Sequence, residues 1–256
     1  MTWSAQQYSL FEAERTRPVR DLLSAVPPKE VAWAADLGCG PGNSTEVLLH
    51  RCPDAAITGV DSSSDMLDAA RERLPGLRFQ QADIAAWQPS DPYDLILANA
   101  SLQWIPDHAA LFPQLAGCLT PGGSLAIQMP DNQDEPVKRL LRQVAASPRW
   151  ADRLGDERST RFPRHPATWY YDLLTPHCRR VDIWRTTYWH VLPGGVDAIV
   201  EWFKGSALRP FLALLDPQEQ PAFLQDYRDA LAQAYPVQAD GSVLLPIPRF
   251  FLVATR

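Results

Sequence analysis

Residues 36–45 form a glycine-rich segment between an apolar run and a helical pattern. It reads Asp36-Leu37-Gly38-Cys39-Gly40-Pro41-Gly42-Asn43-Ser44-Thr45, after the apolar residues 31–35 and before the residues 46–49, which favour a helix. Glycine has no Cβ, so these three glycines let the backbone turn sharply and approach a ligand closely. The segment predicts a strand, a ligand-binding turn and the start of a helix, the first unit of an open α/β sheet.

An acidic residue stands two positions before the first glycine. The carboxylate of Asp36 would repel a pyrophosphate placed on the following helix N-terminus. It favours instead a cationic or amine-bearing ligand, such as S-adenosylmethionine, which carries an ammonium and a sulfonium group. A nicotinamide site would in addition ask for glycine at the sixth place of the motif, where this chain has Asn43.

Polar residues follow each of the next predicted strands. Asp61 comes about 20 residues after the glycines, where an acidic side chain accepts hydrogen bonds from a ribose. Asp83 ends the third strand, where its carboxylate suits an adenine amino group, and Asn99 ends the fourth. The carboxyl ends of parallel strands form the ligand-binding edge of such a sheet. This series predicts a class I methyltransferase that uses S-adenosylmethionine as its cofactor.

The pattern of strands and helices predicts an α/β fold in two parts. Strands alternate with helices near residues 43–51, 64–73 and 107–118, which indicates a parallel sheet covered on both faces. We expect a Rossmann-like class I methyltransferase fold, with a seven-stranded, mostly parallel sheet, an antiparallel terminal strand and a helical cap. Residues 1–131 would form the cofactor-binding core with N-terminal covering helices. Residues 132–256 would form cap helices and loops interleaved with two strands, near 180–192 and 247–254, that complete the core sheet.

Several segments outside the alternating core have weaker patterns. Pro18 interrupts the apolar positions of residues 8–25, which predicts two helical pieces rather than one long helix. In the second part we expect helices near 134–146, 196–205 and 217–235, and a loop or lid over residues 147–166.

Composition narrows the class of partner. The net charge of −6 argues against nucleic acid, whose phosphates require a basic face. No apolar run is long enough for a membrane span, and the amino end lacks the pattern of a signal peptide. The four cysteines are scattered, so we expect neither disulfides nor a metal site. These features favour a cytoplasmic enzyme that acts on a small molecule.

The second part of the chain holds the candidates for substrate binding. Arg209 and Arg249 lie among apolar residues, and the planar guanidinium of arginine binds carboxylates through two parallel hydrogen bonds. The expected substrate-binding residues are Trp104, Tyr171, Tyr188, His190, Arg209 and Arg249.

The sequence resembles the bacterial trans-aconitate 2-methyltransferases. The resemblance rests on residues 13–18 and 35–45, on Asn99-Ala100-Ser101-Leu102-Gln103-Trp104, on Gln128-Met129-Pro130-Asp131-Asn132, on residues 181–188, and on Gly205-Ser206-Ala207-Leu208-Arg209-Pro210 and the residues that follow. It implies methyl transfer from S-adenosylmethionine to one carboxylate of trans-aconitate, giving a monomethyl ester. A carboxylate with a pKa near ~4 is already ionised at neutral pH, so such a reaction needs no general base.

These expectations give a residue set and leave alternatives open. No residue is expected to be essential as an acid or base, and Gln103, Trp104, Tyr188 and His190 are candidates for positioning. One alternative is a methyltransferase of another small organic acid or of a hydroxyl, which would need a base such as His190 or Tyr188. The other is a non-catalytic module that binds S-adenosylmethionine or a nicotinamide cofactor. The expected cofactor-binding residues are Arg15, Arg17, Asp36, Gly38, Gly40, Gly42, Asp61, Ser62, Met66, Asp83, Ile84, Asn99 and Leu102.

Overall fold

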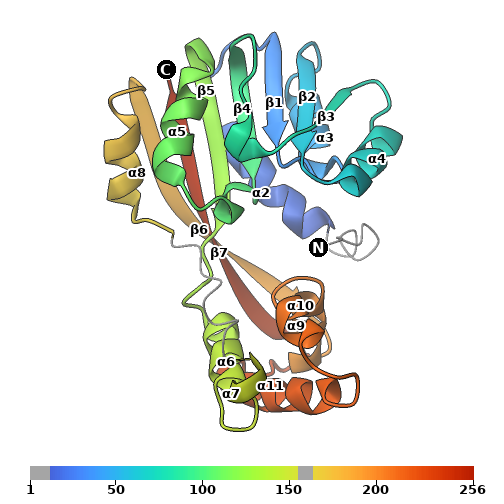
Figure 1. Cartoon of the computed structure of the whole chain (residues 1–256). Helices are drawn as coiled ribbons and strands as arrows, with labels where there is room; N and C mark the ends of the chain where they lie inside the picture. The colour runs from blue at the N-terminus through green and yellow to red at the C-terminus, as the bar shows by residue number, and fades with distance from the viewer. Residues whose placement is uncertain (1–11, 155–163) are drawn as a thin grey trace. The chain divides into compact units, whose positions relative to one another are not determined.

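A computed structural model describes residues 12–154 and 164–256, and it contains one seven-stranded sheet (Figure 1). The strand order is β3-β2-β1-β4-β5-β7-β6. Strands β1 to β5 pair in parallel, and β7 pairs antiparallel with β5. The predicted Rossmann-like fold with its antiparallel terminal strand is therefore confirmed. The strands are β1 Trp33–Leu37, β2 Ala56–Asp61, β3 Arg78–Gln81, β4 Tyr93–Asn99, β5 Leu119–Pro130, β6 Arg180–Leu192 and β7 Val243–Thr255.

The helices connect these strands or follow them. Those in the alternating core are α2 Glu12–Ser24, α3 Asn43–Arg51, α4 Ser64–Arg73 and α5 His108–Gly117, with short 3-10 turns η2 Ile84–Ala86 and η3 Leu102–Trp104. The later helices are α6 Pro136–Ala145, α7 Ala151–Leu154, α8 Ala167–Leu174, α9 Val196–Lys204, α10 Arg209–Ala213 and α11 Gln220–Ala234. The sequence did not predict α7, α8 or α10. Two of these three have five residues or fewer, too short to show a helical period.

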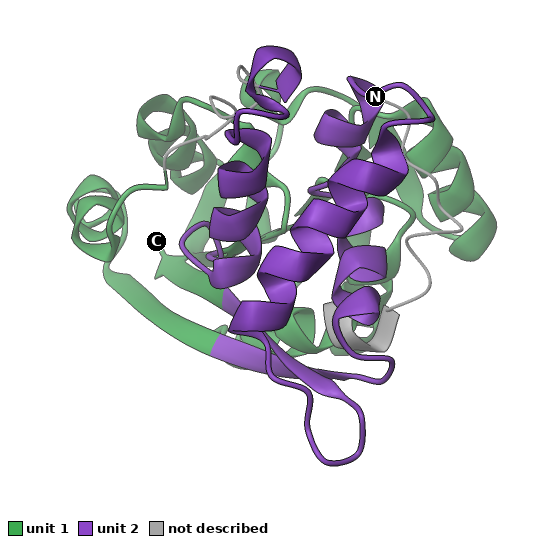
Figure 2. Ribbon diagram, turned by 90° about the horizontal axis from the view of Figure 1, so that it is seen from below, with its two compact units in different colours: residues 1–130, 162–186, 249–256 green, residues 131–161, 187–248 purple. Residues whose placement is uncertain are grey.

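The chain divides into two compact units, coloured green and purple in Figure 2. Unit 1 comprises residues 1–130, 162–186 and 249–256, and unit 2 comprises residues 131–161 and 187–248. Strands β6 and β7 each contribute residues to both units.

The core of unit 1 lies on one face of the sheet. Side chains alternate along each strand, so Leu125, Ile127 and Met129 of β5 point into this core, where α5 and α8 cover them. Phe112 of α5 and Tyr170 of α8 are fully buried there. Burying one such side chain stabilises the fold by about 1.5–3 kcal/mol. The opposite face carries the remaining strand residues, and α2 packs against β5 and α3.

Helix α2 runs through Pro18, so the predicted break at this proline is wrong for the described residues. Proline inside a helix removes a backbone donor and costs about 3 kcal/mol. Val19, Leu22 and Leu23 follow it and are all buried. Their burial offsets the cost of Pro18, which the local pattern could not reveal. Residues 8–11 of the predicted segment lie outside the described residues.

Unit 2 is built around α6 and α11. The hydroxyl of Tyr227 donates to the carbonyl of Val137 at 2.9 Å, and the hydroxyl of Tyr235 accepts from the N–H of Val137 at 3.1 Å. Trp150 adds an edge-on contact with Phe223, with ring centroids 5.5 Å apart. The two tyrosine contacts tie α11 and its carboxyl end to α6. Helices α6, α9 and α11 confirm the three predicted helices to within a few residues.

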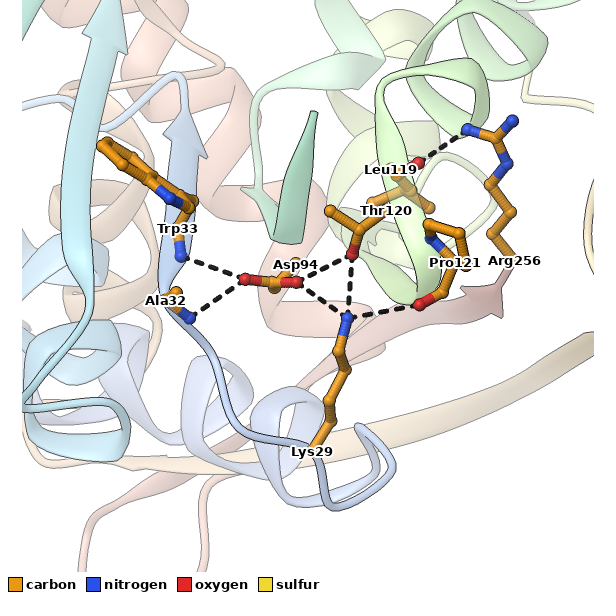
Figure 3. Close-up of polar contacts among 8 residues, drawn as sticks. All are labelled: Lys29, Ala32, Trp33, Asp94, Leu119, Thr120, Pro121 and Arg256. Atoms are coloured by element: carbon orange, nitrogen blue, oxygen red, sulfur yellow. Dashed lines mark hydrogen bonds and ion pairs between the residues drawn. The ribbon is translucent and has the colours of Figure 1, made fainter. Parts of the chain in front are cut away.

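A polar cluster joins the amino ends of three strands (Figure 3). Lys29 Nζ lies 2.7 Å from Asp94 Oδ1 and 2.8 Å from Thr120 Oγ1, while Asp94 Oδ2 accepts the N–H groups of Ala32 and Trp33. Burial alone would raise the pKa of Asp94, but the hydrogen bonds from Lys29, Thr120 and the two backbone groups outweigh it and lower the pKa to about 2. The cluster ties β1, β4 and β5 together at the edge opposite the glycine turn.

Candidate functional site

The glycine turn adopts a backbone that only glycine tolerates well. Gly38, Gly40 and Gly42 have φ values of 75°, 53° and 91°. A Cβ on Gly38 would lie 2.2 Å from Cβ of Ser101, which follows β4. The N–H of Gly38 donates to the carbonyl of Val60 at 2.7 Å. The turn is therefore fixed between the carboxyl ends of β1, β2 and β4, as the sequence predicted for this edge.

Asp36 lies beneath this turn and is fully buried. Its Oδ2 accepts hydrogen bonds from the hydroxyls of Ser44 and Thr45, each at 2.7 Å, whereas its Oδ1 has no partner among the described residues. The pKa of Asp36 is raised to about 6. Burial raises it most, the hydrogen bonds from Ser44 and Thr45 offset part of that rise, and the charge of Asp61 adds to it. The buried, unbonded oxygen fits a positively charged ligand, which would compensate the charge.

Asp61 lies at the end of β2 and holds the turn from the side. Its Oδ2 accepts the N–H of Gly40 and its Oδ1 accepts the N–H of Ser63, both at 2.9 Å. Each carboxylate oxygen keeps a second lone pair for another donor. Ser62 is exposed, while Met66 is buried on α4.

Asp83 and Ile84 occupy the next strand end. The side chain of Asp83 is exposed and caps η2 by accepting the N–H of Ala85 at 2.9 Å. Ile84 is buried, and its Cδ1 would lie 3.5 Å from a Cβ on Gly38. The structure thus brings Ile84 and Gly38 together, with Asp83 next to Ile84 in the chain.

The end of β4 combines a strained backbone with unbonded amide oxygens. Ala100 has a φ of 53°, the only positive value among the non-glycine residues that the structure describes. Such strain is concentrated at functional sites. Asn99 Oδ1 and Gln103 Oε1, on either side of Ala100, are buried and have no partner in the described part of the chain.

A buried histidine supports the turn that follows β4. His108 Nε2 lies 2.8 Å from the carbonyl oxygen of Leu102, which can only accept, so Nε2 carries the proton. Its Nδ1, 2.7 Å from the hydroxyl of Tyr170, therefore accepts from that hydroxyl. Burial lowers the pKa of His108, which favours this neutral form. Nothing in the sequence indicates the bond between His108 and Tyr170, which lie 62 positions apart.

The remaining candidates of unit 1 lie on α2, η3, α8 and β7. Arg17 is exposed on α2, with its Nε 4.0 Å from Asp21 Oδ2, and the side chain of Arg15 lies outside the described part of the structure. Trp104 and Tyr171 are 56% and 50% exposed. Arg249 pairs in register with Pro130 on the neighbouring strand β5. Arg249 belongs to unit 1.

Three substrate candidates belong to unit 2. Tyr188 and His190 are both buried on β6, and the ring of His190 lies 4.8 Å from that of Trp202. Arg209 is the first residue of α10. The described residues contain no cluster of His, Cys, Asp or Glu that could hold a metal ion. The candidate set left out Gln128 of β5, which is buried and whose two amide atoms have no partner among the described residues.

Comparisons with known proteins agree with this geometry. A family model described as a methyltransferase domain matches residues 34–123. Among solved structures, the YcgJ protein of Bacillus subtilis has a TM-score of 0.60 at 12% identity, covering 94% of this chain and 98% of that one. A putative methyltransferase of Bacillus halodurans also has a TM-score of 0.60, at 13% identity, with 93% and 98% coverage. These two likenesses concern the fold alone.

Curated relatives are similar over the full length. Trans-aconitate 2-methyltransferase of Azoarcus sp. (strain BH72) is 51% identical over 255 residues, covering 100% of this chain and 99% of the relative. The enzyme of the same name from Methylobacterium nodulans is 55% identical, covering 99% and 98%. The resemblance seen in the sequence is thereby confirmed, and the chain belongs to the trans-aconitate 2-methyltransferase family of class I methyltransferases.

Proposed function

We propose that this chain transfers a methyl group from S-adenosylmethionine to one carboxylate of trans-aconitate, forming the monomethyl ester. The observation that carries the proposal is the similarity of 51–55% identity, over essentially the whole chain, to relatives of that name. The glycine turn, Asp36 and Asp61 at one sheet edge support the same activity.

Two features of the turn fit the cofactor. A Cβ on Gly40 would meet nothing within 4 Å, so the turn faces open space there, and Asp36 presents a buried oxygen without a partner in the described residues. Asp61 would hold the ribose hydroxyls, and Asp83 and Ile84 the adenine. Asn99 and Leu102 would lie beside the methionine end, with Arg15 or Arg17 reaching its carboxylate.

The chain's own residues have to position the acceptor rather than activate it. When bound, the cofactor supplies a methyl group on a positively charged sulfur, and transfer to a carboxylate oxygen leaves a neutral thioether and moves no proton. Aligning the reacting atoms can supply roughly 7–11 kcal/mol of the barrier. Gln103, Trp104, Tyr188 and His190 would position the acceptor, and Arg209 and Arg249 would bind its other carboxylates.

A panel of organic acids tests the proposal directly. The purified protein is incubated with S-adenosylmethionine and each acid, and S-adenosylhomocysteine and the ester are measured by mass spectrometry. We expect turnover with trans-aconitate and a product heavier by one methylene, with citrate and cis-aconitate as comparison acids. Absence of product from trans-aconitate, with cofactor binding intact, would contradict the proposal.

A second measurement separates a carboxylate from a hydroxyl acceptor. A hydroxyl needs a base, and losing it would lower kcat by roughly 10²–10⁴. A carboxylate acceptor has no proton to remove, so His190 is not needed as a base. His190→Phe, which keeps a ring to pack against Trp202, should therefore keep kcat within about tenfold.

The location of the enzyme is part of the proposal. In the described ranges no helix is long and apolar enough to cross a membrane. The cytoplasmic location expected from the sequence stays a prediction.

A further inference from the structure

Gln128 is a buried polar residue whose side chain has no hydrogen-bond partner among the described residues. It is 1% exposed, and both atoms of its amide, Nε2 and Oε1, are buried and unbonded. Exchanging the two atoms in the assignment would not change this result, because neither is satisfied. Its backbone carbonyl, by contrast, accepts the N–H of Ala100 at 2.9 Å.

An unbonded buried amide is unfavourable and uncommon. Native proteins satisfy the large majority of buried polar groups, and an exception calls for an explanation such as a ligand. Two more unbonded buried amide oxygens, of Asn99 and Gln103, occur at the end of β4. These groups form a concentration of unmet hydrogen-bonding capacity near one edge of the sheet.

The sheet register places Gln128 in this edge. Gln128 of β5 lies opposite Asn99 of β4 and Phe251 of β7. Its neighbours Ile127 and Met129 point into the core, so Gln128 points to the opposite face of the sheet. Asp36 lies on that same face, one pair of residues nearer the amino ends of the strands. Phe251 stacks on Trp184, with ring centroids 4.9 Å apart, and so forms an apolar wall beside the amide.

The chemistry of an amide suits an acceptor carboxylate at this position. Its Nε2 carries two N–H donors, and a carboxylate is an acceptor only. A lysine or arginine would bind the carboxylate more strongly but would repel the positively charged methyl donor. A neutral amide can donate to a carboxylate oxygen through Nε2 without that repulsion. Its Oε1, the negative end of the amide dipole, then points away from the carboxylate.

We propose that Gln128 is a specificity-determining residue whose Nε2 donates a hydrogen bond to the carboxylate of the substrate that receives the methyl group. The proposal rests on the proposed function and names one group of the substrate site. Asn99 and Gln103 contribute acceptors for donors on the ligands at the same edge.

The test replaces Gln128 by methionine, which has a similar length and no amide. We expect KM for trans-aconitate to rise about tenfold to a hundredfold, the range for losing a hydrogen bond to a charged group. The affinity for S-adenosylhomocysteine should stay within about threefold. The melting temperature should be unchanged or higher by roughly 2–4 °C, because an unsatisfied buried amide has been removed.

Ser124→Ala is the matched control, on the same strand and the same face. Ser124 Oγ lies 3.0 Å from Thr255 Oγ1, so this bond is satisfied. Its loss should lower the melting temperature and leave KM unchanged, the reverse of Gln128→Met. Gln128→Leu serves as a second apolar variant if the methionine variant does not fold.

The outcomes separate the two proposals. Wild-type protein without turnover of trans-aconitate would contradict the proposed function and the role of Gln128 with it. Wild-type turnover with an unchanged KM in Gln128→Met would overturn the role of Gln128 alone. A lower melting temperature in both apolar variants, with KM unchanged, would show that a buried water satisfies the amide.

Discussion

Asp36 should make the stability of this protein fall as the pH rises from about 4 to 6. Its carboxyl is fully buried, and burial raises its pKa from 3.8 to about 6. Between these values the unfolded chain has lost the proton and the folded chain retains it, so folding becomes less favourable with increasing pH. At about 1.4 kcal/mol per pKa unit, the ionised Asp36 lowers the free energy of unfolding by about 3 kcal/mol above pH 6.

Asp36→Asn removes the charge and keeps an oxygen that accepts from Ser44 and Thr45. The difference in stability between the variant and the wild type should therefore change with pH, whatever its value at one pH. We expect the variant to gain about 1.4 kcal/mol on the wild type between pH 5 and pH 8, and nothing more above that. Most of this gain should appear by about pH 6.5.

Urea unfolding at 25 °C, followed by fluorescence and circular dichroism at pH 5, 6, 7 and 8, measures this difference. Thr45→Val is a control in the opposite direction, because it removes a hydroxyl that donates to the ionised carboxylate at 2.7 Å. It should raise the pKa of Asp36 further and extend the loss of stability above pH 6. A difference between Asp36→Asn and wild type that is the same at pH 5 and pH 8 would refute the reasoning.

Three further predictions concern stability. Gly38→Ala should abolish cofactor binding and lower the free energy of unfolding by at least about 3 kcal/mol, since its Cβ would meet a side chain at 2.2 Å. Gly40→Ala, with nothing within 4 Å of its Cβ, should lower the melting temperature less than Gly38→Ala does. Asp94→Asn should cost about 2 kcal/mol at pH 7, a loss that vanishes as the pH falls from 3.8 towards 2, where the wild type also becomes protonated. Tyr170→Phe should cost about 1–3 kcal/mol by leaving Nδ1 of His108 unbonded, and an unchanged urea midpoint would count against this bond.

The fold and the glycine turn could be predicted because their determinants are local. The turn needs positive φ at Gly38, Gly40 and Gly42, and glycine is the residue that adopts it at low cost. Alternating strands and helices imply a parallel sheet, and the carboxyl ends of parallel strands necessarily share an edge. The spacing of Asp61 thus placed its carboxylate at this edge, where it accepts the N–H of Gly40 at 2.9 Å, and its contact with a ribose stays a prediction.

Contacts between distant residues could not be predicted in this way. Nothing near Pro18 in the sequence shows that α2 continues through it, because the compensating burial comes from other elements. The bond between His108 and Tyr170, and that between Lys29 and Asp94, join residues 62 and 65 positions apart. A single sequence carries the residue types of such pairs but no information on which ones meet.

The amino-acid sequence by itself determined the class of fold and the family, and it predicted the edge where ligands would bind, since turn conformation and the alternation of strands and helices follow from short patterns. The tertiary structure decided which polar groups at that edge remain unsatisfied. Gln128 is one glutamine among many in the sequence, and only the packing of β5 between β4 and β7 leaves its amide buried without a partner in the described residues. Burial and hydrogen bonding are properties of neighbours in space, and those neighbours come from strands far apart in the chain.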